Sequence, residues 1–151
     1  MNTNGNIKKI LIKDLCSRLP YGVKIDIRFS DEHGSSLRSR ICGEGLSTLN
    51  VDELWLFQQH EIEVKPYLFP MESMTDEMLE ELNANGFFKY RDTIANVSHM
   101  ESNGKVSEEI YTYIDIENIS FLMEFFYSHH IDFRGLIDEG LALDATGLNI
   151  Y

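Results

Sequence analysis

The 151-residue sequence predicts a single α+β domain. A helical apolar pattern comes first, over residues 6–18. Short segments that alternate apolar and polar residues follow it, and helical patterns return after residue 75. Closely spaced strands are typical of an antiparallel meander. We therefore expect an N-terminal helix, an antiparallel meander sheet of four to five strands, and a mostly helical C-terminal half.

The first helix is predicted over residues 6–18 and should stop before Pro20. Residues 23–29 then alternate cleanly, which is typical of a half-buried strand. After a turn rich in Asp, Gly and Ser, residues 37–42 alternate again, until Gly43 and Gly45 break the pattern. The two segments predict an antiparallel hairpin, and its buried residues should include Ile25, Ile27 and Ile41.

Two further short strands are predicted, over residues 53–58 and 61–65. Pro66 and Pro70 should keep the next segment extended and mark the passage from sheet to helices.

The C-terminal half begins with a helix for which Thr75 is a suitable N-cap. Its inner face should hold Met78, Leu79 and Leu82, and Gly86 should end it. Within residues 87–116, the pair Asn103-Gly104 favours a hairpin. The helix that follows should bury Ile119, Leu122, Phe125 and Phe126.

Residues 129–151 allow three interpretations. A metal site would use His129, His130 and Asp132, but adjacent histidines diverge by about 100° on a helix. A phosphate loop would need glycine spacings that the sequence lacks. We therefore favour a structural role and expect no metal site. In this role, Asp132 caps a helix over residues 133–139, Gly140 takes a left-handed conformation, and the following apolar residues dock on the body: Leu141, Leu143, Leu148, Ile150 and Tyr151.

Two phrases carry a family resemblance, "VKPYLFPMESMTDEM" and "HHIDFRGLIDEGLALDA". They resemble an uncharacterised group of small proteins from gut Bacteroidetes and their phages and mobile elements. The resemblance covers about 30 residues, leaves residues 83–118 outside, and implies a phage or mobile-element setting. It implies no activity and no catalytic residue.

The net charge of −12 arises entirely in the second half of the chain. Residues 1–70 hold nine bases and nine acids, whereas residues 71–151 hold four bases and sixteen acids. Such acidity disfavours direct binding to nucleic acid or to an anionic membrane. It favours a protein partner with a basic surface, although acidity also keeps a protein soluble.

Two candidate binding sites follow from the charges. The stronger is an acidic face formed by Glu72, Asp76, Glu77, Glu80 and Glu81. The weaker is a basic patch on the predicted hairpin, formed by Arg28, Arg38 and Arg40.

The sequence predicts no catalytic residue and no cofactor. Cys16 and Cys42 should be small, partly buried thiols. With no signal-peptide pattern, we expect a cytoplasmic protein. The leading hypothesis is an acidic interaction protein, and the alternative is a small-ligand-binding protein or enzyme with a site assembled across the fold.

Overall fold

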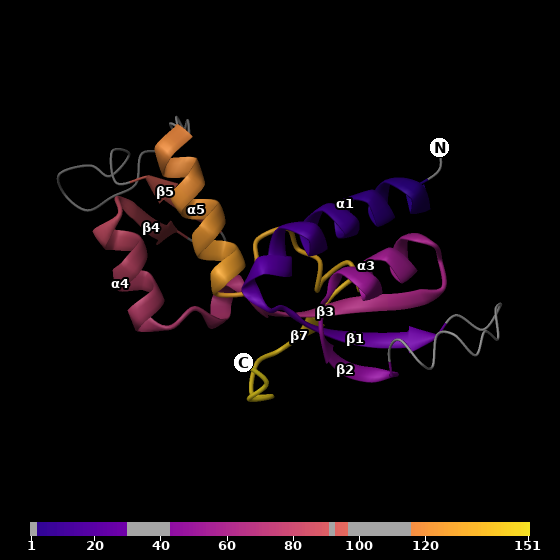
Figure 1. Cartoon of the computed structure of the whole chain (residues 1–151). Helices are drawn as coiled ribbons and strands as arrows, with labels where there is room; N and C mark the ends of the chain where they lie inside the picture. Colours follow the sequence, from indigo (N-terminus) through magenta and orange to yellow (C-terminus); the bar gives the residue numbers. More distant parts are fainter. Residues whose placement is uncertain (1–2, 30–42, 91–92, 97–115) are drawn as a thin grey trace.

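The computed structural model describes residues 3–29, 43–90, 93–96 and 116–151 (Figure 1). In chain order the elements are α1 (Thr3–Arg18), η1 (Leu19–Tyr21), β1 (Lys24–Phe29), β2 (Gly45–Thr48), α3 (Val51–Gln58), β3 (Ile62–Pro70), η2 (Met71–Ser73), α4 (Asp76–Ala84), β4 (Phe87–Tyr90), β5 (Thr93–Asn96), α5 (Ile116–Ser128), β6 (Ile131–Asp132) and β7 (Leu143–Asp144). The predicted α+β class, with its N-terminal helix and a sheet of about five strands, is confirmed.

The five-stranded sheet is mixed. It runs in the order β2-β1-β3-β6, and β7 also pairs with β3. β1 is antiparallel to β2 and to β3 and lies between them, so β2 and β3, which follow each other in the sequence, are not neighbours in the sheet. The two-residue strands β6 and β7 instead run parallel to β3, because the C-terminal segment returns to the sheet from α5. The predicted antiparallel pairing therefore holds for three strands, but their order is not that of a meander, and the closing segment supplies the other two strands.

β1 confirms the alternation over residues 23–29. Ile25 and Ile27 are fully buried, whereas Asp26 and Arg28 lie on the opposite face. The predicted partner over residues 37–42 lies outside the described residues. On the edge of β1 away from β3, the described neighbour is β2. Its first residue is Gly45, which we had expected to end the strand.

Residues 53–58 are helical, so the strand predicted there is wrong. The helix α3 begins with a capping box: the Glu53 amide donates to Asn50 Oδ1 at 2.9 Å, and the Asn50 amide donates to Glu53 Oε2 at 3.2 Å. Glu53, Leu56 and Phe57 are buried, which is the spacing of one helix face. The cap satisfies the first amides of the helix, and the apparent alternation was too short to distinguish strand from helix.

The strand predicted over residues 61–65 is confirmed, but β3 continues to Pro70. Pro66 does not end the strand, because it is buried within β3 opposite Ile25. The chain leaves the sheet only after Pro70, where η2 begins.

α4 begins and ends as predicted. The Met78 amide donates to Thr75 Oγ1 at 3.3 Å, Leu82 is fully buried, and Gly86 follows the helix with φ of +85°. β4 and β5 then form an antiparallel pair. The hairpin predicted at Asn103-Gly104 lies outside the described part of the chain.

α5 confirms three of its four predicted core residues. Leu122, Phe125 and Phe126 are buried, but Ile119 is 42% exposed, so its assignment to the core was wrong.

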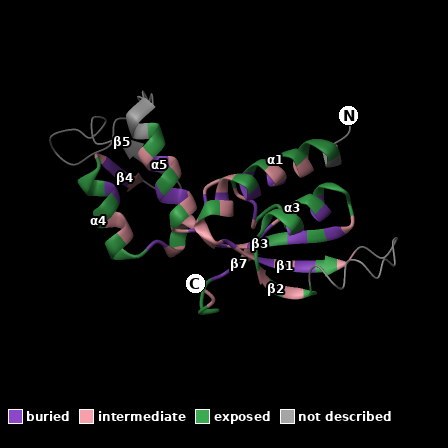
Figure 2. Ribbon diagram, in the orientation of Figure 1, coloured by how far each residue is buried: buried purple, intermediate pink, exposed green. Residues whose placement is uncertain are grey.

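The described residues form two apolar cores. The first lies between the sheet and the helices α1 and α3 (Figure 1). The second lies among α4, β4 and α5. Figure 2 shows buried residues in both parts of the molecule, with exposed residues along the outer sides of the helices.

The helix predicted over residues 133–139 is wrong, because these residues form turns. The Asp132 carboxylate does accept main-chain hydrogen bonds, from Leu136 at 2.9 Å and Ile137 at 2.8 Å. Gly140 has φ of +71°, and the Leu141 amide donates to the Leu136 carbonyl at 2.8 Å. Asp132, Gly140 and Leu141 thus make the contacts predicted for them, but they close a single turn over residues 136–140 and not a helix.

The tail that follows docks only in part. Leu143 joins the sheet in β7, but Leu148 is 49% exposed, so the prediction that Leu148 docks is wrong.

Candidate functional site

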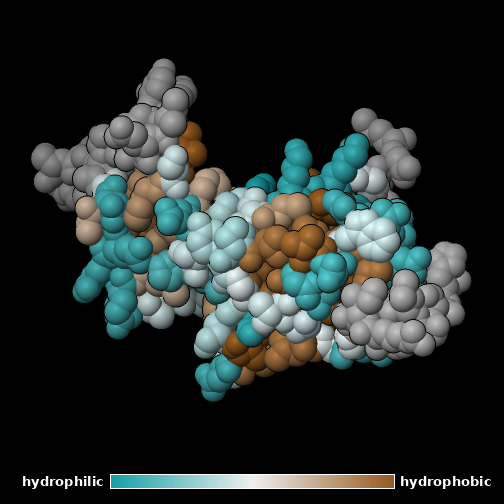
Figure 3. All heavy atoms as spheres, in the orientation of Figure 1, coloured by the Kyte–Doolittle hydropathy of each residue, from teal (hydrophilic) through white to brown (hydrophobic). Residues whose placement is uncertain are grey.

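The acidic face lies on η2 and α4. All five of its carboxylate residues are exposed, and Figure 3 shows hydrophilic side chains covering α4. The apolar side of α4 holds the helix against the second core through Leu82 and the half-buried Met78 and Leu79. The acidic face is therefore presented to solvent by a helix that is anchored from behind.

Few cations neutralise the acidic face. Within the described part of the chain, its one salt-bridge contact joins Glu81 Oε2 to His129 Nε2 at 2.8 Å, and His129 carries a charge only when it is protonated. The ammonium group of Lys89 lies nearby but donates to the Met71 carbonyl at 3.1 Å. The pKa of Glu77 lies below its ordinary value, because its carboxylate accepts hydrogen bonds from its own amide and from the Thr75 hydroxyl group. These contacts stabilise the negative charge of the face.

The proposed basic patch is not basic where the structure describes it. Arg28 Nε lies 3.1 Å from Asp26 Oδ2, and the carboxylates of Glu63 and Glu44 also raise the pKa of Arg28. Arg38 and Arg40 lie outside the described residues. Arg28 thus belongs to a mixed-charge surface on the open face of the sheet.

This open face alternates in charge across β1 and β3. Asp26 stands directly opposite Lys65, and Arg28 stands directly opposite Glu63. Opposite charges at such positions stabilise strand pairing by about 0.2–1 kcal/mol each. The sequence showed the charged residues of each strand, but only the register shows that they are complementary.

His129, His130 and Asp132 do not converge on one point. His129 bonds Glu81, the His130 ring stacks on the Tyr151 ring with centroids 3.8 Å apart, and Asp132 binds main-chain amides. Among the described residues, no group of three or more His, Cys, Asp or Glu could hold a metal ion.

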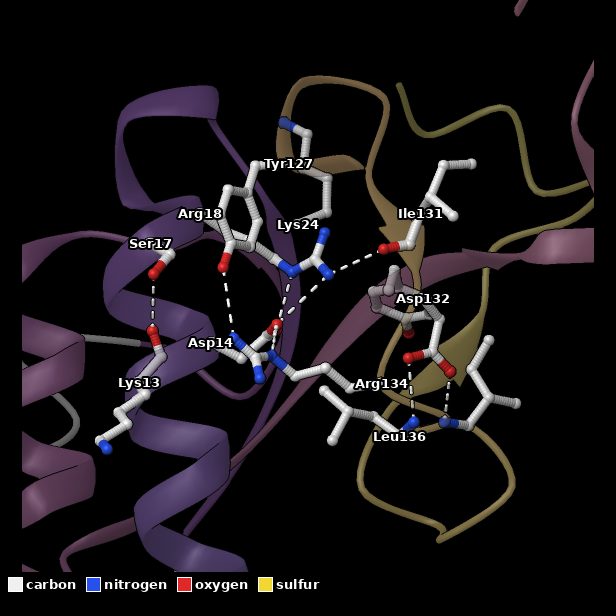
Figure 4. Close-up of polar contacts among 12 residues, drawn as sticks. Lys13, Asp14, Ser17, Arg18, Lys24, Tyr127, Ile131, Asp132, Arg134 and Leu136 are labelled. Atoms are coloured by element: carbon white, nitrogen blue, oxygen red, sulfur yellow. Dashed lines mark hydrogen bonds and ion pairs between the residues drawn. The ribbon is translucent and has the colours of Figure 1, made fainter. Parts of the chain in front are cut away.

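A buried charge network joins the two parts of the fold, and sequence reasoning missed it (Figure 4). Arg18 Nε donates to Asp14 Oδ2 at 2.7 Å, and both side chains have no exposed surface. Arg18 Nη2 also donates to the Ile131 carbonyl at 2.8 Å. From the C-terminal segment, Arg134 Nε donates to Asp14 Oδ1 at 3.2 Å. The network thus ties the end of α1 to β6 and to the turn after it.

Aromatic rings complete this junction. The Arg18 guanidinium lies 5.2 Å from the Tyr127 ring centroid and 5.8 Å from that of Phe133, within the range of cation–π attraction. The i,i+4 spacing of Asp14 and Arg18 is visible in the sequence. It did not indicate burial, because such pairs usually lie on solvated helix surfaces.

A groove of about 560 Å³ runs between α1, the end of α3 and β3. Its walls are mainly apolar and include Leu11, Phe57 and Leu141. Lys8 Nζ lies 2.7 Å from His60 Nδ1 and 4.9 Å from the centre of the Phe57 ring. Burial lowers the pKa of Lys8. In Figure 3, apolar residues are exposed around α3, between α1 and the sheet.

Cys16 is exposed, so the prediction of a partly buried thiol is wrong for this residue. Cys42 lies outside the described residues.

Comparisons with known proteins give no relative. No protein-family model matches the chain, and neither the curated proteins nor the solved structures include a significant match. The resemblance to small proteins of gut Bacteroidetes therefore stays a prediction. In the part of the chain that the structure describes, no helix has the length and apolar character needed to span a membrane.

Proposed function

We propose that this chain is an interaction protein whose acidic face binds a basic surface on another protein. The observation that carries this proposal is the exposure and lack of salt bridges, within the described residues, of four carboxylates of the acidic face, Glu72, Asp76, Glu77 and Glu80. All four are exposed, and none has a salt-bridge partner among the described residues. A set of like charges on one surface attracts a partner of opposite charge and raises the rate of association.

Three of these carboxylates, Asp76, Glu77 and Glu80, lie on α4, and this position supports the same function. Like charges four residues apart, such as Asp76 and Glu80, destabilise a helix by a few tenths of a kcal/mol. The Thr75 cap and the buried Leu82 hold the helix in place despite this repulsion. Asp76, Glu77 and Glu80 therefore keep their positions on α4 without a salt bridge to any of the described residues.

The test is a double charge reversal, Glu77→Lys with Glu80→Lys. This variant leaves Glu81 and its bond to His129 in place. The matched control is Asp138→Lys with Glu139→Lys, which changes the net charge equally at two exposed positions outside α4. Wild type and both variants are used to capture proteins from an extract of the producing cells, and the captured proteins are compared by mass spectrometry.

We expect a basic protein that wild type and the control capture and that the α4 variant loses. Stopped-flow association with that protein at two ionic strengths should then show a slower rate and a weaker salt dependence for the α4 variant alone. Equal capture and equal rates for all three proteins would rule out the acidic face as the binding surface.

A further inference from the structure

The outer edge of β3 is open over residues 62–65. In a strand, the main-chain groups of successive residues point to opposite edges. The Leu49 amide donates to the Val23 carbonyl at 2.9 Å, so the main-chain groups of Val23 face β2 and those of Lys24 face β3. The Lys24 amide indeed reaches the Tyr67 carbonyl through the Tyr151 hydroxyl group, with distances of 2.8 Å and 2.6 Å.

The odd-numbered residues of β3 therefore face β1, and the even-numbered residues face away from it. The Ala145 amide donates to the Leu68 carbonyl at 2.8 Å on that far edge, in agreement with this alternation. β7 covers the far edge only from Tyr67 onward. Within the described part of the chain, the main-chain groups of Ile62 and Val64 on this edge thus have no partner strand.

The groove follows this open edge. Residues 62–65 line it, and Ile7 and Leu11 of α1 form its apolar wall. Ile10, on the same helix, is 46% exposed. A strand placed along this edge would bond the free main-chain groups and cover apolar surface on α1.

The charges beside the edge identify a matching strand. Glu63 and Lys65, the residues before and after Val64 in the sequence, lie on the open face of the sheet, whereas Val64 is buried on the other face. An antiparallel strand with the order acid, apolar residue, base would place its base opposite Glu63 and its acid opposite Lys65. The order Glu63-Val64-Lys65 is itself such a sequence, so the edge is complementary to a second copy of itself.

We propose that the β3 edge pairs with the β3 edge of a second copy of this chain, antiparallel and centred on Val64. The two Val64 residues then exchange two main-chain hydrogen bonds, because even-numbered residues face this edge. Each Glu63 stands opposite Lys65 of the other copy. The rows of alternating charge on β1 and β3 continue across the joint, and the two α1 helices lie on the same face of the joined sheet.

The test is sedimentation velocity from about 1 to 300 µM protein, a range that reveals micromolar dimers. A salt concentration of about 0.15 M screens the repulsion between the distant acidic halves. Wild type should dimerise as concentration rises. Glu63→Lys and Lys65→Glu should each raise the dimer dissociation constant about tenfold or more, since each places like charges opposite one another twice in the symmetrical dimer.

An equimolar mixture of the two variants should dimerise again, because each variant then offers the charge that the other lacks. Glu139→Lys and Lys13→Glu are controls with the same changes in net charge at exposed positions away from this edge, and they should behave as wild type. Thermal unfolding checks that every variant is folded. If a charge-reversal variant is unfolded, Glu63→Gln or Lys65→Gln is used in its place.

Three results would each overturn the proposal: a wild type that stays monomeric over the whole concentration range, variants that dimerise as wild type does, or a mixture that stays monomeric. The acidic face takes no part in this test.

Discussion

The imidazole ring of His130 lies nearly parallel to the phenol ring of Tyr151, with the ring planes 17° apart. His130 is 8% exposed, and its Nδ1 atom has no partner among the described residues. Its backbone has φ of +56°, which is rare for a residue with a side chain. The stack places a titratable ring inside the joint between α5, β6 and the closing segment, and this placement makes stability depend on pH.

We predict that the protein loses stability in acid through His130. Burial, then the positive charges of Arg18, His129 and Lys24, lower the pKa of His130 to about 4. The unfolded chain therefore takes up a proton near pH 6.5, before the folded protein does. The free energy of unfolding should fall as pH drops from 6.5 to 4, by at most about 1.4 kcal/mol per pH unit from this group.

Denaturant unfolding at pH 7, 6, 5 and 4 measures this effect. His130→Asn should flatten the pH dependence in that window, because asparagine tolerates a positive φ and does not titrate. Leu148→Asn is the control, at an exposed position in the same closing segment, and it should keep the wild-type slope because neither residue titrates. Identical slopes for all three proteins would show that His130 does not govern acid stability.

The Tyr151 hydroxyl group should stabilise the sheet. It accepts from the Lys24 amide and donates to the Tyr67 carbonyl, and so bridges β1 and β3 beyond their last paired residues. Tyr151→Phe should lower the free energy of unfolding by about 0.5–1.5 kcal/mol, since the two exposed main-chain groups exchange their bonds to the hydroxyl group for bonds to water. Tyr21→Phe removes a hydroxyl group that makes no hydrogen bond to the described residues, and it should change stability little. Equal effects in urea unfolding would contradict the bridging role.

The buried pair Asp14–Arg18 should show strong coupling. Arg18→Met leaves the fully buried Asp14 with only Arg134, which is partly exposed. Removing one partner of a buried pair typically costs about 3–5 kcal/mol, whereas replacing both with apolar residues costs much less. Arg18→Met should therefore be more destabilising than the double variant Asp14→Leu with Arg18→Met. A double-mutant cycle measured by thermal unfolding tests this, and additive effects would count against the pair as a unit.

The capping box of α3 should contribute to stability. Asn50→Ala removes the acceptor of the Glu53 amide and should cost about 1 kcal/mol. Asp52→Ala, in the same first turn but outside the box, should cost only a few tenths of a kcal/mol by weakening the helix-dipole interaction. The two values come from urea unfolding curves, and a cost for Asn50→Ala no larger than that for Asp52→Ala would refute the capping role.

The sequence by itself determined the elements whose signals are local. The helix over residues 6–18, the strand over residues 23–29 and the helix capped by Thr75 all follow from periodicity, capping and chain breaks. The exposure of the acidic face was predictable for the same reason, because charged residues on one side of an anchored helix face solvent. The capping box of Asn50 and Glu53 was also a local signal for a helix. The alternating pattern over residues 53–58 predicted a strand instead and obscured this signal.

Only the tertiary structure decided which charges are buried and which strands meet. Arg18 is buried because the Ile131 carbonyl, 113 residues later, accepts its hydrogen bond. Residues after α5 form strands because β3 offers them free main-chain groups, whereas residues 133–139 have too short an apolar pattern to sustain a helix. Periodicity describes how one segment divides between core and solvent. Burial of an ion pair and pairing of an edge depend on groups that a distant segment brings, so no local pattern contains them.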